Sequence, residues 1–234
     1  MNAVEIKTAE RLFGAGLYSV AEASRLTRVP AATFRRWVFG YARTRTAGRV
    51  EYKPISQPEI GRIDGQYVVG FHDLLEARVV QAFRQAGVSW HVIRLAAQNV
   101  QGNKKLSHPF LSRHFRTDGR TIFLETAEAL GKPELLDLAR NQHAFHSVIA
   151  PSLFKQIEFD DNDEAILWYP LWPKKTVIID PQRSFGRPLV ANIPADTLAA
   201  TAHAENSVEA AARWYNITPD RVRDAIAWQD RLAA

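Results

Sequence analysis

Two short amphipathic stretches separated by a proline lie between Leu17 and Phe39, and this pattern constrains the fold more than any other part of the sequence. Ser19 can cap a first helix whose apolar residues recur at three-residue spacing: Val20, Ala23, Leu26 and Val29. Pro30 disfavours helical geometry at Val29 and suits the beginning of the next helix. We therefore expect two short helices joined by a tight turn.

The second stretch divides its side chains between two faces of the expected helix. The apolar ones fall at positions i, i+3 and i+4: Phe34, Trp37 and Val38. Thr33 and Arg36 fall on the other face, and Arg35 lies beside them. A second helix that is basic on its free side is typical of a helix-turn-helix, whose recognition helix enters the major groove of DNA. The alternative is an ordinary helical hairpin with surface arginines.

The charge of the chain is concentrated on the same segment. The whole chain carries a formal net charge of +5, but residues 1–54 hold ten Lys and Arg against four Asp and Glu. Residues 121–170 hold three against nine. This gradient favours an N-terminal segment that binds a polyanion over an evenly basic surface. Because most of the basic residues are Arg, forked hydrogen bonds to phosphate or guanine are expected.

The composition excludes several classes of protein. The chain has no Cys, so it contains no disulfide, thiolate metal site or cysteine nucleophile, which fits a reducing compartment. No apolar run approaches the roughly 20 residues that span a bilayer, and the first 20 residues lack the apolar core of a signal peptide. We expect a cytoplasmic protein without membrane contact.

A basic polar segment follows the two helices. It carries four cations: Arg43, Arg45, Arg49 and Lys53. Val50–Ile55 and Gln66–Phe71 have the character of strands and could pair as a hairpin around a ten-residue connection. Such a hairpin would be a wing whose basic residues follow the phosphate backbone. A helix is expected from Phe71 to Gly87, and another after Ser89.

The order of these pieces resembles the MerR-like winged-helix family over about residues 15–100. The resemblance rests on Tyr18–Glu22, Thr33–Trp37, Phe71–Leu75 and Ala86–Ser89. Two departures are visible, because the wing region is longer than in that family and the long dimerisation helix that usually follows is absent. Some members of that family sense metal ions through cysteine thiolates, and this property cannot be inferred for a chain without Cys.

The middle of the chain is predicted to be mixed. Phe110–Phe115 and Thr121–Leu124 are expected as short strands around a turn, and Pro133 as the beginning of a helix. Leu153–Phe159 and Ala165–Tyr169 are expected to form a hairpin. Its connection, Asp160-Asp161-Asn162-Asp163-Glu164, could hold a metal ion, but a solvated turn is the stronger interpretation. His143 and His146 lack a third ligand at usable spacing and are interpreted as helix-surface residues.

The last 60 residues are expected to form a separate unit. Two short strands, at Thr176–Ile179 and Leu189-Val190, precede three helices that begin near Ala195, Ser207 and Thr218. Residues 171–234 hold eight basic against seven acidic residues, so this bundle gains little from DNA. Trp214, Tyr215 and Trp228 fit either a protein contact or the core of the bundle.

The C-terminal segment resembles a small domain family found in VapB-type antitoxins that pair with PIN-like ribonuclease toxins. The resemblance covers about residues 175–232 and rests on Val177–Pro181, Phe185–Pro188, Ser207–Glu209 and Tyr215. It implies a toxin partner whose active site is a cluster of carboxylates around a divalent metal ion. An arginine inserted among those carboxylates would block the site, with Arg183 and Arg187 as candidates.

We therefore predict a mainly α fold with small β elements in three segments. These are a winged helix-turn-helix over 1–102, a mixed α/β connection over 103–173 and a small helical, helix-turn-helix-like antitoxin bundle over 174–234. Predicted DNA contacts are Ser19, Arg28, Thr33, Arg35, Arg36, Arg43, Arg45, Arg49 and Lys53. Predicted toxin contacts are Arg183, Phe185, Arg187, Trp214, Tyr215 and Trp228.

The predicted function is that of a homodimeric type II antitoxin, which binds operator DNA and a PIN-like toxin and needs no cofactor. The first alternative is a stand-alone MerR-like regulator in which residues 103–234 bind an effector or form oligomers. The second is a metal-dependent nuclease that uses the acidic turn. The sequence gives no positive case for an enzyme, because it lacks a nucleophile elbow, a phosphate-binding glycine loop and a His-Glu-x-x-His helix.

Overall fold

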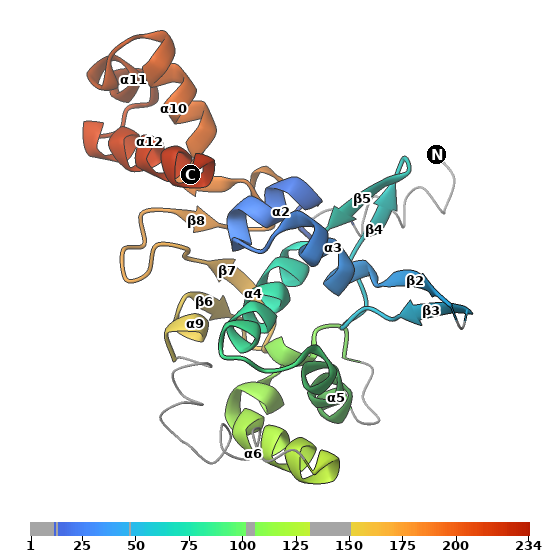
Figure 1. The fold of residues 1–234 in the computed structure, drawn as a ribbon. Helices are drawn as coiled ribbons and strands as arrows, with labels where there is room; N and C mark the ends of the chain where they lie inside the picture. Colours follow the sequence, from blue (N-terminus) through green and yellow to red (C-terminus); the bar gives the residue numbers. More distant parts are fainter. Residues whose placement is uncertain (1–11, 13, 47, 102–105, 132–150) are drawn as a thin grey trace, which may run out of the picture. The chain divides into compact units, whose positions relative to one another are not determined.

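The computed structural model describes residue 12 and residues 14–46, 48–101, 106–131 and 151–234, and it is mainly helical with small sheets (Figure 1). The chain forms two compact units. The helix-turn-helix unit comprises Tyr18–Phe154 together with Asp161–Glu164. The C-terminal unit comprises Lys155–Asp160 and Ala165–Ala234, together with the chain up to Leu17.

The helix-turn-helix unit begins with the two helices that the sequence predicts. The short strand β1 (Tyr18–Ser19) leads into α2 (Val20–Thr27), and α3 (Ala31–Phe39) follows. Arg28 ends α2 in a left-handed conformation with φ 59°, and Pro30 stands immediately before α3. The predicted turn around the proline is therefore confirmed.

The single long wing predicted between Val50–Ile55 and Gln66–Phe71 is wrong, because the chain forms two separate hairpins. In the first, β2 (Tyr41–Arg45) pairs antiparallel with β3 (Gly48–Tyr52). In the second, β4 (Gly61–Ile63) pairs with β5 (Gln66–Val69), and β5 also pairs with β1.

Local turn chemistry explains this difference. Asp64 and Gly65 join β4 to β5, and both have positive φ, at 48° and 79°. Asp-Gly is a strong signal for a two-residue hairpin turn, since both central residues of such a turn need positive φ. Each strand therefore pairs with its immediate neighbour instead of crossing a ten-residue connection.

Four consecutive helical segments follow β5 in this unit. They are α4 (Phe71–Gln85), α5 (Trp90–Gln101), the 3-10 turn η1 (Pro109–Leu111) and α6 (Arg113–Leu130). The strands predicted at Phe110–Phe115 and Thr121–Leu124 are wrong, because the turn-like residues between them lie inside α6.

An aromatic cluster accounts for the helix α6. Phe115, Ile122, Phe123 and Thr126 are buried at helical spacing, and the rings of Phe115 and Phe123 pack against Phe83 of α4. Gly119, which suggests a turn in the sequence, lies over the ring of Phe115, where a Cβ would come within 3.3 Å of ring atoms. The helix predicted at Pro133, with His143 and His146, lies outside the described residues.

A five-stranded antiparallel sheet organises the C-terminal unit. Its strands are β6 (Ile157–Phe159), β7 (Ala165–Trp168), β8 (Ile178–Ile179), β9 (Pro188–Val190) and β10 (Ile193–Pro194), and they lie in the order β10-β9-β8-β7-β6. The hairpin around the acidic residues is confirmed, although its first strand is shorter than predicted because α9 (Pro151–Lys155) precedes it. The segment boundary expected at Pro173 falls inside this sheet, since β7 pairs with β8.

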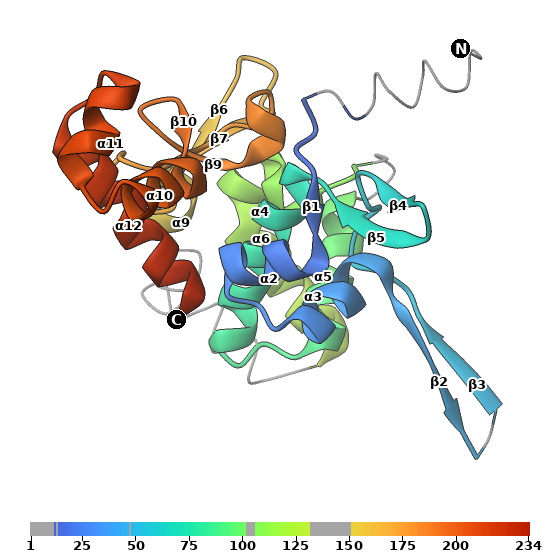
Figure 2. The same cartoon turned by 90° about the horizontal axis from the view of Figure 1, so that it is seen from above.

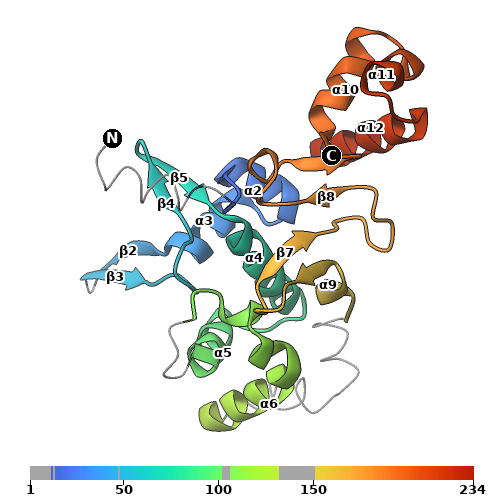
Figure 3. The same ribbon diagram turned by 180° about the vertical axis from the view of Figure 1, so that it is seen from behind.

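Three helices follow the sheet, as predicted: α10 (Ala195–Ala204), α11 (Val208–Tyr215) and α12 (Pro219–Ala233), which Figure 3 shows as a small bundle. The Ser207 hydroxyl caps α11 by accepting from the N–H of Ala210. Small side chains form the core of the bundle, with Ala202, Ala211, Ala212 and Val222 buried. Among the described residues, no helix is both long and apolar enough to cross a membrane.

Candidate nucleic-acid interface

The helix α3 presents a basic face and buries an apolar one. Phe34, Trp37 and Val38 are buried, with at most 7% of each side chain exposed. Arg35 and Arg36 are exposed and Thr33 is half-buried. The helix contains no acidic residue. Its outer face therefore offers guanidinium groups and a hydroxyl to an anionic partner, as the sequence predicts.

Aromatic rings position these guanidinium groups. Arg36 lies over the ring of Tyr41, with 5.4 Å from Cζ to the ring centroid. Arg35 lies over the ring of Tyr67 at 5.2 Å. A ring face attracts a cation without using its N–H donors. Both arginines are therefore oriented while their N–H groups stay available to phosphate or bases.

Arg62 belongs to the same surface, and the sequence reading missed it. Its guanidinium donates to the Tyr67 hydroxyl and lies 4.2 Å from the ring centroid. The Arg62 hydrogen bond is the main cause that lowers the pKa of Tyr67 below its ordinary value. Arg62 and Tyr67 are cross-strand partners on either side of the Asp64-Gly65 turn, so recognising this turn would have brought them together.

The hairpin β2–β3 carries most of the other predicted DNA contacts. Arg43, Arg49 and Lys53 are exposed, and Arg49 lies 3.5 Å from the carboxylate of Glu51. Arg45 pairs through its backbone with Gly48 at the end of the hairpin, and its side chain lies outside the described part. The rings of Tyr41 and Tyr52 stack at the other end, with centroids 4.5 Å apart.

Lys53 also lines a hollow of about 360 Å³ beside the hairpin. The opposite wall comes from one face of α5, with Arg94, Gln98 and Gln101 at helical spacing. The lining includes two cations and no acidic residue. Arg94 is therefore a further candidate for anion contact that the sequence reading did not single out.

Two predicted contacts, Ser19 and Arg28, lie at the ends of α2. The Ser19 hydroxyl accepts from the N–H of Glu22 at 3.2 Å, and the Glu22 carboxylate accepts from the Ser19 N–H at 2.8 Å. This reciprocal arrangement is a capping box. Ser19 therefore has a structural role, and a DNA contact by it stays a prediction. Arg28 is exposed at the turn before α3.

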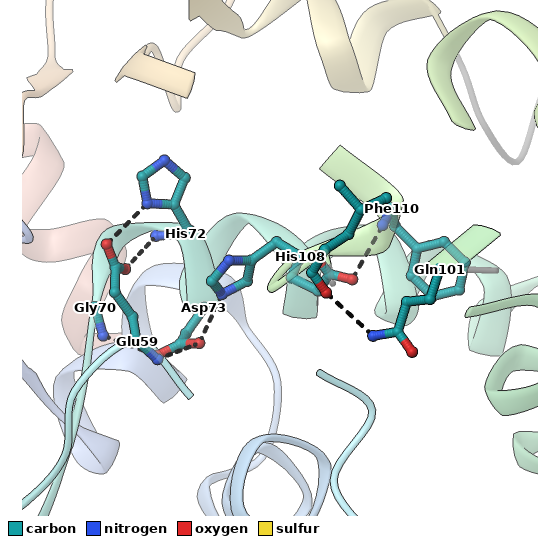
Figure 4. A network of polar contacts seen from close by, with 9 residues as sticks. Glu59, Gly70, His72, Asp73, Gln101, His108 and Phe110 are labelled. Atoms are coloured by element: carbon teal, nitrogen blue, oxygen red, sulfur yellow. Dashed lines mark hydrogen bonds and ion pairs between the residues drawn. The ribbon is translucent and has the colours of Figure 1, made fainter. Parts of the chain in front are cut away.

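A network of polar side chains fixes the segment before β4 to the beginning of α4 (Figure 4). The buried carboxylate of Asp73 accepts from the N–H of Gly70 at 3.0 Å and from the N–H of Glu59 at 3.2 Å. In return, the Glu59 carboxylate accepts from the N–H of His72 at 3.0 Å and lies 2.9 Å from its Nδ1. These bonds set where the second hairpin begins.

The two most exposed large aromatic side chains among the described residues of the C-terminal unit are Trp214 and Phe185. Trp214 on α11 is 71% exposed, and Phe185 in the 3-10 turn η2 (Ser184–Gly186) is 59% exposed. Phe185 has a φ of 56°, in the left-handed region that favours glycine. An apolar ring held outward on a strained backbone fits a contact surface better than a packing role.

The two predicted toxin-contacting arginines lie beside Phe185 in sequence and carry local partners. Arg183 lies 3.2 Å from the Asp180 carboxylate and donates to Asn192 at 2.9 Å. Arg187 pairs with Asp196, and this pair is half-exposed. Burial acts to raise the pKa of Asp196, but the hydrogen bond and the charge of Arg187, together with backbone hydrogen bonds, outweigh burial and lower this pKa. An exposed ion pair is worth about 0–1 kcal/mol, so either arginine can exchange its partner at small cost.

The prediction that Trp228 contacts the toxin is wrong. Trp228 is only 2% exposed and lies in α12, so its ring belongs to the core of the helical bundle. Tyr215 is half-buried, and its hydroxyl lies 3.1 Å from the Thr201 hydroxyl. Of the three aromatic residues predicted on these helices, Trp214 alone is fully available to a partner.

The fold and the basic face of α3 define a helix-turn-helix DNA-binding protein with a second, α/β unit. Comparison with known proteins agrees, since residues 16–97 match the family described as "Putative DNA-binding HTH domain". The curated "Putative antitoxin VapB45" of Mycobacterium tuberculosis is 31% identical over 96% of this chain and 97% of its own length. The chain belongs to this VapB45 antitoxin family.

A solved structure shows the same fold. The crystal structure of Rv2018 from Mycobacterium tuberculosis matches with a TM-score of 0.70 and 28% identity, covering 92% of this chain and 98% of that one. The similarity extends over both units and is not limited to the helix-turn-helix.

Proposed function

We propose that this chain is a type II antitoxin that represses its own operon and neutralises a PIN-like ribonuclease toxin. The helix-turn-helix unit binds operator DNA through α3, and the C-terminal unit binds the toxin. The observation that carries the DNA half is the face of α3, where Arg35 and Arg36 are exposed and held by tyrosine rings.

The proposed DNA contacts divide by their position. Thr33, Arg35 and Arg36 lie on the recognition helix and read base edges, because a helix of this kind enters the major groove. Arg43, Arg45, Arg49 and Lys53 follow the helix in sequence and hold the phosphate backbone, which fixes register more than it reads sequence. As in the MerR-like proteins that the sequence resembles, binding as a homodimer would place two such helices on two half-sites.

The proposed toxin surface is formed by Phe185, Trp214, Arg183 and Arg187. Exposed aromatic and Arg side chains are the residues that dominate protein interfaces. The toxin is inhibited when one of the arginines leaves its local carboxylate and enters the acidic, metal-binding active site. The family membership and the exposure of these groups support this half of the proposal.

Co-expression with the product of the neighbouring gene tests the toxin half. We expect the two proteins to co-purify and the antitoxin to restore growth, whereas Trp214→Ala with Phe185→Ala should abolish both effects. Trp172→Ala is the matched control, since Trp172 is also exposed in the same unit. A wild-type chain that neither co-purifies nor protects would leave the stand-alone regulator as the better description.

A further inference from the structure

The hollow beside Lys53 has the size of a small-molecule site. Figure 2 shows the hairpin β2–β3 projecting from the end of α3, and residues 53–58, which follow the hairpin, form one wall of the hollow. The other wall is one face of α5. The volume of about 360 Å³ lies within the range of ligand pockets, which begins at about 300 Å³.

The two walls carry cations without a counter-charge. Lys53 and Arg94 are the charged residues of the lining, and neither has an ion-pair partner among the residues that the structure describes. Glu59 follows the first wall in sequence, but its carboxylate accepts from the N–H of His72 and lies 2.9 Å from the Nδ1 of that ring. Because Arg94 is half-buried, an unbalanced charge there is costly and the hollow favours an anion.

The pair of cations fits a phosphate monoester. Such a group carries a charge of about −1.5 to −2 at pH 7, which two cations balance. The guanidinium of Arg94 offers two parallel N–H donors to one phosphoryl group, and the ammonium of Lys53 adds a point charge. A DNA backbone meets exposed side chains such as Lys53. Arg94 is half-buried on the second wall, so a small molecule inside the hollow reaches it more easily than a duplex does.

The rest of the lining suits a nucleobase. Gln57 and Gln98 are exposed on the two walls. Their amides both donate and accept, which is the pairing that glutamine makes with the edge of adenine. Apolar surface for the face of a base comes from Pro54, Ile55 and Pro58. An inorganic phosphate ion would leave both the amides and this apolar surface unused.

We propose that this hollow binds a nucleoside monophosphate, with the phosphoryl group between Lys53 and Arg94 and the base beside Gln57 and Gln98. The inference goes beyond operator and toxin binding and does not depend on either of them.

Both walls are attached to one residue of the recognition helix, Trp37. The N–H of Ile55 on the first wall donates to the carbonyl of Trp37 at 3.0 Å. The ring of Trp90, the first residue of α5, stacks on the ring of Trp37 with centroids 5.7 Å apart. A ligand that bridges the walls therefore acts on α3 through Trp37, and it changes the surroundings of two tryptophan rings.

Calorimetric titration of the full-length chain tests the inference, with tryptophan fluorescence as a second readout. The probes are AMP, GMP, CMP and UMP, together with the four nucleosides and inorganic phosphate. We expect at least one nucleotide to bind with a Kd below about 1 mM. Its nucleoside, which lacks the phosphoryl group, and inorganic phosphate, which lacks the base, should each bind at least about tenfold more weakly.

Variants on both walls locate the bound nucleotide. Lys53→Ala and Arg94→Ala should each weaken its binding about tenfold, because each removes a hydrogen bond to a charged group. Lys53 is exposed, so its variant is expected to fold. Arg25→Ala is the matched control, since Arg25 is an exposed arginine of α2 outside the lining, and this variant should bind the nucleotide like the wild type.

Four results would overturn the inference. The first is the absence of saturable binding for all four nucleotides. The second is equal affinity for inorganic phosphate and the nucleotides, which would make the hollow a general anion site. The third is unchanged nucleotide affinity in both wall variants, which would place the ligand elsewhere. The fourth is a loss of duplex DNA binding in Arg94→Ala without nucleotide binding by the wild type, which would assign the hollow to a backbone phosphate.

Discussion

Nε2 of His108 lies 2.9 Å from Oδ1 of Asp73, a residue 35 positions earlier in the chain. The same carboxylate accepts backbone hydrogen bonds from Gly70 and Glu59. One buried side chain at the beginning of α4 therefore joins three segments: the loop before β4, the start of α4 and the chain before η1. The path of the second hairpin and the packing of the middle helices depend on it.

Glu76 lies one turn further along α4 and is only 1% exposed. Its Oε1 accepts from the N–H of Phe110 at 3.1 Å, while its Oε2 has no hydrogen-bond partner among the described residues. Burial raises the pKa of Glu76 to about 7, against the opposing effects of His108 and of the Phe110 N–H. Burial disfavours the charged form of His108, but the hydrogen bond to Asp73 and the nearby carboxylates raise its pKa.

We predict that the chain is more stable at pH 5 than at pH 8. Because the pKa of Glu76 rises from 4.5 to about 7 on folding, the folded chain binds more protons in this range and its free energy of unfolding falls as pH rises. Deprotonation of Glu76 alone lowers the free energy of unfolding by about 3 kcal/mol as the pH rises. The raised pKa of His108 acts in the same direction, because its stabilising charge is lost at higher pH. Urea unfolding at several pH values measures this slope.

Glu76→Gln provides the control for this pH dependence. The variant cannot ionise, so its free energy of unfolding should vary less between pH 5 and 8 than that of the wild type. Because the comparison concerns the slope, a general loss of stability in the variant does not affect it. An unchanged slope would assign the pH dependence to groups other than Glu76.

Asp73→Ala is predicted to destabilise the helix-turn-helix unit by about 3–5 kcal/mol. The substitution leaves the N–H groups of Gly70 and Glu59 without their acceptor and removes the partner of His108. Asp73→Asn keeps one acceptor oxygen, so this variant should lose less stability than Asp73→Ala. Urea unfolding followed by tryptophan fluorescence measures both, and equal losses would contradict this account of the carboxylate.

Much of this fold follows from local sequence patterns. The turn at Pro30, the cap at Ser19 and the three C-terminal helices were predictable because each depends on residues within one or two helical turns. The division of α3 into an apolar and a basic face follows from spacing alone, since Phe34, Trp37 and Val38 repeat at helical positions.

Other features depend on contacts between distant segments. Gly119 suggests a turn, but the packing of Phe115 and Phe123 against Phe83 stabilises a helix through it. The Asp73–His108 contact joins residues whose proximity no local pattern encodes. Trp228 could be assigned to core or surface only once the burial of α12 was known.

Ser19→Ala tests whether this residue caps a helix or contacts DNA. Loss of the cap should cost about 1 kcal/mol of stability, because the N–H of Glu22 loses its acceptor. Ser19→Asp keeps an acceptor for the cap but adds a negative charge. If DNA affinity falls with Ser19→Asp and stability does not, Ser19 lies near a phosphate. If DNA affinity is unchanged in both variants, Ser19 only caps the helix.

Arg36→Ala and Arg49→Ala should weaken DNA binding in different ways and leave toxin neutralisation unchanged. Arg36 lies on the recognition helix, so its loss should cost about 1–3 kcal/mol and relax sequence preference. Arg49 lies on the exposed hairpin, so its loss should reduce the slope of log K against log salt by about one. Binding titrations at several salt concentrations separate them, and a parallel loss of toxin binding would show that the two functions overlap.

Gly40→Ala is predicted to separate the hairpin β2–β3 from the recognition helix. Gly40 has a φ of 70° and a ψ of −177°, a region that only glycine occupies readily. An added Cβ would lie 2.5 Å from the carbonyl oxygen of Tyr52 and 3.0 Å from the nitrogen of Pro54. Both are backbone atoms at the end of β3, so the hairpin has to shift.

Gly65→Ala is the matched control, since Gly65 also has positive φ, at 79°, but an added Cβ would meet nothing within 4 Å. It carries the backbone strain of about 1–2 kcal/mol without the collision. We expect Gly40→Ala to lose more stability than Gly65→Ala in urea unfolding and to weaken DNA binding at temperatures where it remains folded. If both variants lose the same stability and bind DNA equally, the contact between Gly40 and Tyr52 does not direct the hairpin.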